Sequence, residues 1–324
     1  MMNQEEVTLI AGVSPDHPFL TEVIMGLSRP QKSLPAKFLY DKKGSEIFER
    51  ICRLKEYYPT RAEIEILRTY KNEIAELVGS DVLLIEPGSG AGEKVRYILN
   101  SLDHPVGYVP IEISREILLR MTDEFAEDFP DLPVLPVCAD FTQRVTLPFD
   151  LHSLETKKVV FFPGSTIGNF SPDEAIGLLK EFGHMMDKGG GLLIGVDQKK
   201  KTDVLERAYD DSEGVTAEFN LNLLNRLNRE ADAQFDVDNF EHKAIYNEKL
   251  GRIEMHLMSK VPQFVKVHGT VFRFHEGETI HTENSYKYSI EEFCELGAKA
   301  GFKIIKHWQD KGNLFCVYYF EKVR

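Results

Sequence analysis

Short apolar runs bounded by turn residues alternate with helical stretches through the middle of this 324-residue chain. Near-continuous apolar strands of this kind are typical of parallel sheets that are covered by helices on both faces. The pattern therefore predicts an α/β protein with a doubly wound core. The runs read DVLLIEP, VGYVPIEI, LPVLPVCAD, KKVVFFPG and GGGLLIGVD.

Three segments place a hydroxyl residue three positions before a glutamate, the pattern of a capping box at the start of a helix. They are TRAE at 60–63, SPDE at 171–174 and SIEE at 289–292. Gly301, after CELGAKA, is a typical helix stop. We expect helices to begin at all three segments.

After Asp197 the pattern changes. TDVLERAYDDSEGVTAEFNLNLLNRLNRE predicts a helix broken near Gly214, and GRIEMHLMSK and QFVKVHGTVFRFHEGETIHTE alternate like antiparallel strands. The segments FKIIKHWQD and NLFCVYYFEKV predict a hairpin that returns to the core sheet. We therefore expect a core at 62–198 and 286–324, and a second, smaller α+β domain at 9–61 and 199–285.

Charge and apolar content narrow the class of protein. The chain has 39 Lys and Arg against 52 Asp and Glu, a net charge of −13, and no basic stripe that would attract nucleic acid. The start, MMNQEEVTLI, lacks the basic residues of a signal peptide, and no apolar run is long enough to span a membrane. These features predict a cytoplasmic protein that binds neither nucleic acid nor membranes.

Four cysteines are scattered along the chain without CxxC spacing, so neither a disulfide framework nor a zinc site is indicated. We expect them to be reduced packing residues. They are Cys52, Cys138, Cys294 and Cys316.

Gly88, Gly90 and Gly92 follow the first apolar run directly. Ligands of open parallel sheets bind at the carboxyl ends of strands, where glycine lets them approach the main chain and its N–H groups. Several nucleotides would suit such a loop.

Acidic residues at the strand ends favour S-adenosylmethionine. Glu86, before the first glycine, would repel a pyrophosphate but not a sulfonium. Glu112 ends the next strand and can accept two ribose hydroxyls, while Asp140 can accept from an adenine amino group and Phe141 can flank the adenine ring. An NAD-type enzyme is the alternative.

Four long segments resemble the histidine Nα-methyltransferases of ergothioneine biosynthesis, over nearly the whole chain. The resemblance implies a Rossmann-like class I methyltransferase core with a substrate-binding domain. It also implies successive transfer of methyl groups from S-adenosylmethionine to the α-amino nitrogen of L-histidine, giving trimethylhistidine (hercynine). The segments are LPAKFLYDKKGSEIFERICRLKEYYPTRAEIEILR, EPGSGAGEKVR, FFPGSTIGNF and RAYDDSEGVTAEFNLNLLNRLNRE.

The resemblance assigns the substrate's amino and carboxylate groups to Tyr57, Gly164, Asn169 and Tyr209. The resemblance further implies that an acid and a serine two residues apart bind the substrate's imidazole, with a methionine beside the ring. Period two on an extended segment points both polar side chains to one face, where they can grip two ring nitrogens. These ring residues are Glu283, Ser285 and Met255.

On the cofactor side the resemblance assigns Tyr40, Gly88, Lys94, Glu112, Asp140 and Phe141. It makes Tyr40 and Asn169 the catalytic residues, with the neutral amine attacking the sulfonium methyl group in line. Tyrosine faces suit the quaternary ammonium that forms. The chain departs from the family in having Glu112 in place of Asp, and in having Pro87 and a third glycine.

The sequence also allows alternative functions. An α-N-methyltransferase of another aromatic amino acid, such as a tryptophan derivative, is the nearest, and a non-catalytic S-adenosylmethionine sensor is a different class. In HEGETIH the histidines are six apart, whereas a helical zinc pair needs a spacing of four. In GSTIG, Thr166 stands where a hydrolase elbow needs serine. We expect a monomer without a metal.

Overall fold

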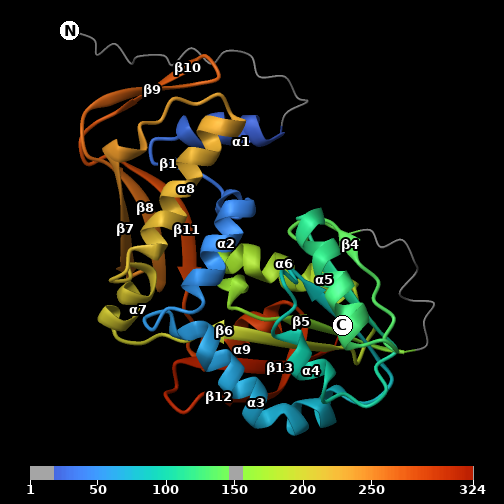
Figure 1. Ribbon diagram of the computed structural model, residues 1–324. Coiled ribbons are helices and arrows are strands. Elements are labelled where there is room, and N and C mark those ends of the chain that lie inside the picture. Colours follow the sequence, from blue (N-terminus) through green and yellow to red (C-terminus); the bar gives the residue numbers. More distant parts are fainter. Residues whose placement is uncertain (1–17, 146–155, 324) are drawn as a thin grey trace. The chain divides into compact units, whose positions relative to one another are not determined.

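A computed structural model describes residues 18–145 and 156–323. The start MMNQEEVTLI and positions 9–17 of the expected smaller domain lie outside these residues. The chain divides into two compact units. Unit 1 comprises the residues up to Tyr58 together with Lys200–Ser285, and unit 2 comprises Pro59–Lys199 with Tyr286–Arg324. Each unit therefore combines segments far apart in sequence, as the colours of Figure 1 show for α1, α2 and the strands β7 to β11.

Unit 2 is built on a seven-stranded sheet in the order β12-β13-β6-β5-β2-β3-β4. Strands β2 to β6 run parallel, and the C-terminal hairpin β12–β13 joins β6 antiparallel, as the sequence predicts. The chain proceeds outward from β2 in one direction and then outward from β5 in the other, so the topological switch point lies between β2 and β5. The strands are β2 (Val82–Pro87), β3 (Gly107–Glu112), β4 (Val137–Cys138), β5 (Lys157–Phe162), β6 (Gly191–Asp197), β12 (Phe302–Gln309) and β13 (Phe315–Lys322).

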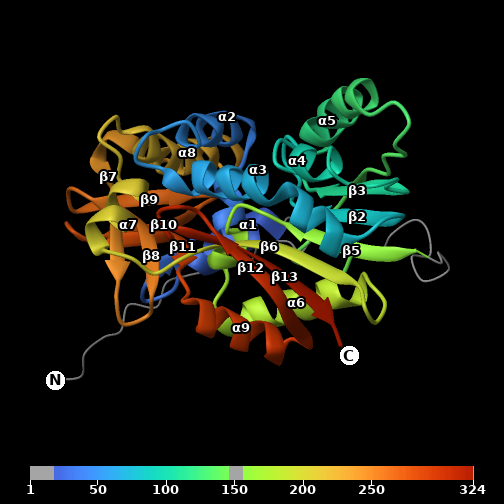
Figure 2. The ribbon, with the colours of Figure 1, turned by 90° about the horizontal axis from the view of Figure 1, so that it is seen from below.

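Helices cover both faces of this sheet (Figure 2). Leu83 and Ile85 of β2 pack with the α6 and α9 side, and Val82 and Leu84 pack with the α3, α4 and α5 side. This alternation buries both faces of the central strand β2 and confirms the doubly wound α/β fold. The helices are α3 (Tyr58–Val78), α4 (Val95–Leu99), α5 (Arg115–Asp128), α6 (Pro172–His184) and α9 (Ile290–Lys299).

Two of the three expected capping boxes form. Ser171 begins α6 and Ser289 begins α9, each in a reciprocal pair with the glutamate three residues on. The box expected at 60–63 is wrong, because α3 already begins at Tyr58 and the side chain of Glu63 is fully buried. Its carboxylate bonds to groups distant in sequence, described below.

Unit 1 contains a four-stranded sheet in the order β1-β11-β8-β7 and a separate β9–β10 hairpin. The helical segment is broken at Gly214, whose φ is 72°, as expected. The sequence did not single out β7. The elements are β1 (Lys32–Ser33), β7 (Phe240–Asn247), β8 (Arg252–Ser259), β9 (Gln263–Val267), β10 (Thr270–Phe274), β11 (Thr279–Tyr286), α1 (Pro18–Leu27), α2 (Lys42–Ile51), α7 (Thr202–Tyr209) and α8 (Val215–Glu230).

The described helices and cysteines bear on two further expectations, about membranes and about thiols. Among their helices, none is both long enough and apolar enough to cross a bilayer. The cysteines are free thiols, but Cys138 is exposed rather than packed, because it lies on the short edge strand β4.

Candidate active site

The three glycines after β2 serve different purposes, although all have positive φ, at 70°, 52° and 65°. A Cβ on Gly88 would lie 2.9 Å from the ring of Phe141, so its absence lets that ring approach the main chain. A Cβ on Gly92 would lie 2.7 Å from Phe125 of α5. A Cβ on Gly90 would meet no heavy atom within 4 Å, which leaves open space beside its backbone.

Glu112 and Asp140 form local bonds near the same strand ends. The N–H of Gly90 donates to Glu112 Oε2 at 3.1 Å, and the N–H of Ser114 donates to Oε1 at 3.0 Å. Asp140 Oδ1 accepts from the N–H and hydroxyl of Thr142, at 2.9 and 2.6 Å. A carboxylate oxygen accepts more than one bond, so both acids retain acceptor capacity for a ligand.

Glu86 lies at the end of β2 and is 2 % exposed. Burial raises its pKa to about 8, even though the hydroxyl of Tyr108 donates to the carboxylate. The carboxyl is therefore mostly protonated at pH 7. A neutral carboxyl would not repel a pyrophosphate. The preference for a sulfonium that the sequence predicted from a charged Glu86 therefore does not hold.

Lys94 and Gly164 contact the same carboxylate. Lys94 Nζ lies 2.6 Å from Glu63 Oε2, and the N–H of Gly164 points at both oxygens of Glu63, at 3.0 and 2.9 Å. The TRAE pattern predicted a capping role for Glu63, so this residue was not among the expected site residues. The available signal was a charged residue at helical spacing from Ile66 and Leu67, which line the apolar face of α3.

Asn169 ends a short 3₁₀ turn, Thr166–Asn169, that follows β5, and is partly exposed. Ser165, just before the turn, has a φ of 58°, and its Oγ accepts from the N–H of Asp197 at 2.9 Å. The Asp197 carboxylate in turn lies 2.7 Å from the Nζ of Lys287, and both side chains are fully buried. The loop carrying Asn169 is thus fixed to the end of β6.

Within unit 1, the predicted tyrosines meet the predicted ring-binding residues. The rings of Tyr57 and Tyr209 lie edge to face with centroids 6.0 Å apart, and Tyr209 Oη lies 2.8 Å from Ser285 Oγ. Burial raises the pKa of both Tyr40 and Tyr57 well above the usual value, and the charge of Glu283 adds to both shifts. These two hydroxyls therefore stay protonated at neutral pH.

Met255 is 1 % exposed on β8, the neighbour of β11 in the sheet. The hydroxyl of Thr282 shares its one proton between the carbonyl oxygen of Met255, at 3.1 Å, and Oδ1 of Asn220, at 2.7 Å. Thr282 directly precedes Glu283. The assigned methionine and the assigned acid are therefore connected through one β11 residue.

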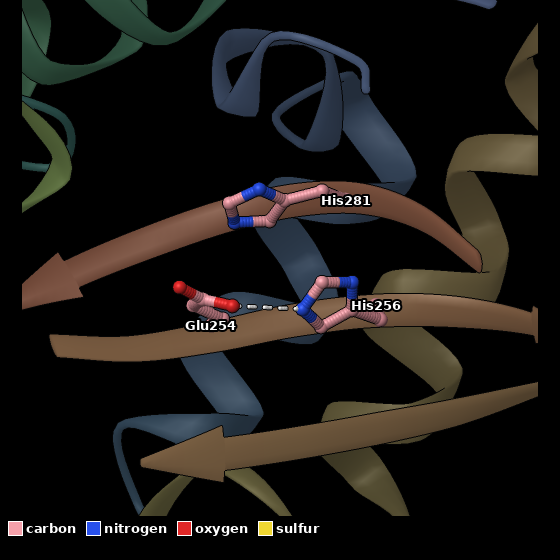
Figure 3. Close-up of side chains that lie close together, drawn as sticks. All are labelled: Glu254, His256 and His281. Atoms are coloured by element: carbon pink, nitrogen blue, oxygen red, sulfur yellow. Dashed lines mark hydrogen bonds and ion pairs between the residues drawn. The ribbon is translucent and has the colours of Figure 1, made fainter. Parts of the chain in front are cut away.

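Glu254, His256 and His281 gather on β8 and β11, with possible ligand atoms within 4.8 Å of one another (Figure 3). Burial lowers the pKa of both imidazoles, so they are neutral. However, Arg252 lies 2.7 Å from Glu254 Oε1, and His281 Nε2 lies 3.0 Å from the carbonyl of Glu283, to which it must donate. The rings also stack at 4.7 Å and 21°. A metal ion binds an imidazole nitrogen in the plane of the ring, and two rings stacked face to face do not point their nitrogens at one ion. The two histidines are therefore arranged as a stacked pair and not as metal ligands.

The sheet order, the glycine loop after β2 and the acids at the next strand ends are features of a Rossmann-like α/β fold that binds a nucleotide-type cofactor at its switch point. The chain belongs to the family of histidine-specific, S-adenosylmethionine-dependent methyltransferases, whose model matches residues 19–322.

Named relatives agree with this membership. The chain is 39 % identical, over 91 % of its length and 92 % of the relative's, to the histidine N-alpha-methyltransferase of Mycobacterium tuberculosis. Identity is 38 %, with the same coverage, to the enzyme of that name from Mycolicibacterium smegmatis. It is 27 %, over 85 % of this chain and 37 % of the relative, to ergothioneine biosynthesis protein 1 of Schizosaccharomyces pombe.

Proposed function

We propose that the protein methylates the α-amino nitrogen of L-histidine and repeats the step to give trimethylhistidine (hercynine), the first step of ergothioneine biosynthesis. The observation that carries this proposal is the 39 % identity, over 91 % of the chain, to a histidine N-alpha-methyltransferase. The match to ergothioneine biosynthesis protein 1 supports the pathway.

In this proposal unit 2 is the methyltransferase core and holds S-adenosylmethionine, which supplies an electrophilic methyl group. The residues present fit that group, because the open space beside Gly90 leaves room for it and Glu112 can still accept hydroxyls. Gly88, Lys94, Asp140 and Phe141 complete the proposed contacts, together with Tyr40 of unit 1.

Unit 1 is proposed to bind the substrate ring. Glu283 accepts from one imidazole N–H, and Ser285, which is bonded to Tyr209, donates or accepts at the other nitrogen. Met255 packs beside the ring. An indole has a single N–H and would leave one of these polar groups without a partner, which costs affinity. This arrangement favours histidine over a tryptophan derivative.

The amino group is proposed to lie with Tyr57, Tyr209, Gly164 and Asn169. Asn169 and the tyrosine hydroxyls orient the lone pair of the neutral amine for an in-line attack. The raised pKa values of Tyr40 and Tyr57 keep both hydroxyls protonated, so they are neutral hydrogen-bonding groups and not bases. The substrate ammonium loses a proton to water before the first attack, and the methylated ammonium loses another before each later one. The ring faces of Tyr40 and Tyr57 stabilise the growing positive charge, by ~0.5–2 kcal/mol each.

Mass spectrometry of the product tests the proposal. The purified protein is incubated with S-adenosylmethionine and, separately, with L-histidine, L-tryptophan and histamine. We expect three successive methyl additions on L-histidine, none on histamine, which has no carboxylate, and little on L-tryptophan. Methylation of tryptophan in preference to histidine would overturn the substrate assignment, and no product at all would indicate a sensor. We further propose a cytoplasmic monomer, which fractionation and sedimentation would test.

A further inference from the structure

We propose that Glu63 is a positioning residue for methyl transfer, because its one carboxylate sets both Lys94 and the loop that begins at Gly164. The inference rests on the proposed assignment of Lys94 to the cofactor and of Gly164 to the substrate. Glu63 itself touches neither ligand in this scheme and acts through those two residues.

The carboxylate of Glu63 lies in a position that the fold reserves for it. A Cβ on Gly195 of β6 would lie 1.9 Å from Glu63 Oε1, so no other residue type fits there without displacing the acid. A Cβ on Gly164 would lie 3.4 Å from Lys94 Nζ, and Gly164 has a φ of 84°. Gly195 therefore makes room for the acid, whereas at Gly164 the positive φ is the feature that favours glycine.

The buried charge of Glu63 requires both of its donors, Lys94 and the N–H of Gly164. The Glu63 side chain is fully buried, and a buried carboxylate is costly unless charged or N–H donors compensate it. Gly164 supplies an N–H directed at both oxygens, and Lys94, 19 % exposed, supplies the positive charge. Displacing either donor leaves the carboxylate under-compensated. The position of Lys94 is therefore coupled to the position of the Gly164 main chain.

The coupling reaches the proposed catalytic residue through a short, fixed path. Gly164 is held by Glu63, and the next residue, Ser165, is held by the N–H of Asp197. The 3₁₀ turn that ends at Asn169 follows at once. A shift of Gly164 therefore moves the start of this turn, and misplacement of a reacting group by 1 Å can reduce rate about 10²-fold.

The test compares Glu63→Gln with Glu76→Gln, an exposed position on the same helix. Glutamine keeps the shape and one acceptor for Gly164 but removes the charge that holds Lys94. We expect Glu63→Gln to raise KM for S-adenosylmethionine and for histidine together and to lower kcat/KM by about 10- to 100-fold. Glu76→Gln should match the wild type. A purely structural role would lower only the active fraction, and unchanged KM values for both substrates would overturn the proposal.

A double-mutant cycle with Lys94→Met isolates the coupling. In the Lys94→Met background, Glu63→Gln should lower kcat/KM much less than in the wild type, because no cation remains that the loss of the carboxylate charge could leave unpaired. Fully additive losses would refute the coupling. Calorimetric titration with S-adenosylhomocysteine gives a second readout that needs no turnover. If the wild type fails to methylate histidine, the proposed function fails, whereas weaker cofactor binding by Glu63→Gln still supports its link to Lys94.

Discussion

The carboxyl of Glu86 titrates far from its usual range because it is buried at the end of β2, beside the hydroxyl of Tyr108. Its folded-state pKa is about 8, whereas the unfolded chain loses this proton near 4.5. The folded state therefore binds the extra proton between these values. Its stabilising contribution is complete below pH 4.5 and is lost as the pH rises through 8.

We predict that Glu86→Gln removes this pH dependence. The free energy of unfolding of the wild type, relative to the variant, should fall by up to ~1.4 kcal/mol per pH unit in that window. Urea denaturation of both proteins at pH 5, 6, 7 and 8 measures the difference. Parallel curves across the series would show that Glu86 does not hold the proton.

Glu283 is predicted to act on the substrate and not on the cofactor. Glu283→Gln should weaken L-histidine binding by ~1–3 kcal/mol, because a neutral amide replaces a charged acceptor. S-adenosylhomocysteine binding should change by less than about twofold, since independent sites contribute nearly additively. Calorimetric titrations of both ligands test this, with the exposed Glu276→Gln as control. Equal losses for the two ligands would contradict the division of roles.

At the scale of elements, the loop between β2 and α4 separates packing from binding. Alanine at Gly90 or Gly92 must adopt a positive φ, at a cost of ~1–2 kcal/mol. Only at Gly92 does the new methyl group also collide with Phe125, which adds ~1–3 kcal/mol. At Gly90 the methyl group enters the open space proposed for the cofactor.

We therefore predict opposite main effects for two similar substitutions. Gly92→Ala should chiefly lower the denaturation midpoint, and Gly90→Ala should chiefly weaken S-adenosylhomocysteine binding. Thermal denaturation and calorimetric titration of the two variants provide the comparison. The glycine loop would need another explanation if Gly90→Ala bound this ligand normally.

The helix starts show which element boundaries the local sequence could predict. At Ser171 and Ser289 the hydroxyl and the glutamate three residues on bond each other, so a four-residue segment contains the whole motif. At 60–63 the same spacing of hydroxyl and glutamate lies inside α3, and Glu63 bonds to Lys94 and Gly164 instead. A competing partner from elsewhere in the chain thus overrides a local pattern.

At the scale of the molecule, the buried pair of Asp197 and Lys287 connects the end of β6 to the segment that returns from β11. Lys287→Met would remove the ammonium that lies 2.7 Å from the fully buried Asp197 carboxylate and should cost ~3–5 kcal/mol of unfolding free energy. Replacing both residues, with Asp197→Leu, should recover part of this loss. Chemical denaturation of the single and double variants tests this; an equal or greater loss in the double variant would exclude charge burial as the cause.

The sequence by itself determined the alternating strands and helices of unit 2, the break at Gly214, two capping boxes and the family motifs. Each of these depends on residues close together in the chain, where periodicity and turn chemistry act. Only the tertiary structure decided the protonation of Glu86 and the role of Glu63, whose partners lie 31 and 101 positions away. Burial and the choice of a charge partner depend on which strands the sheet order brings together, and local pattern carries no information about that.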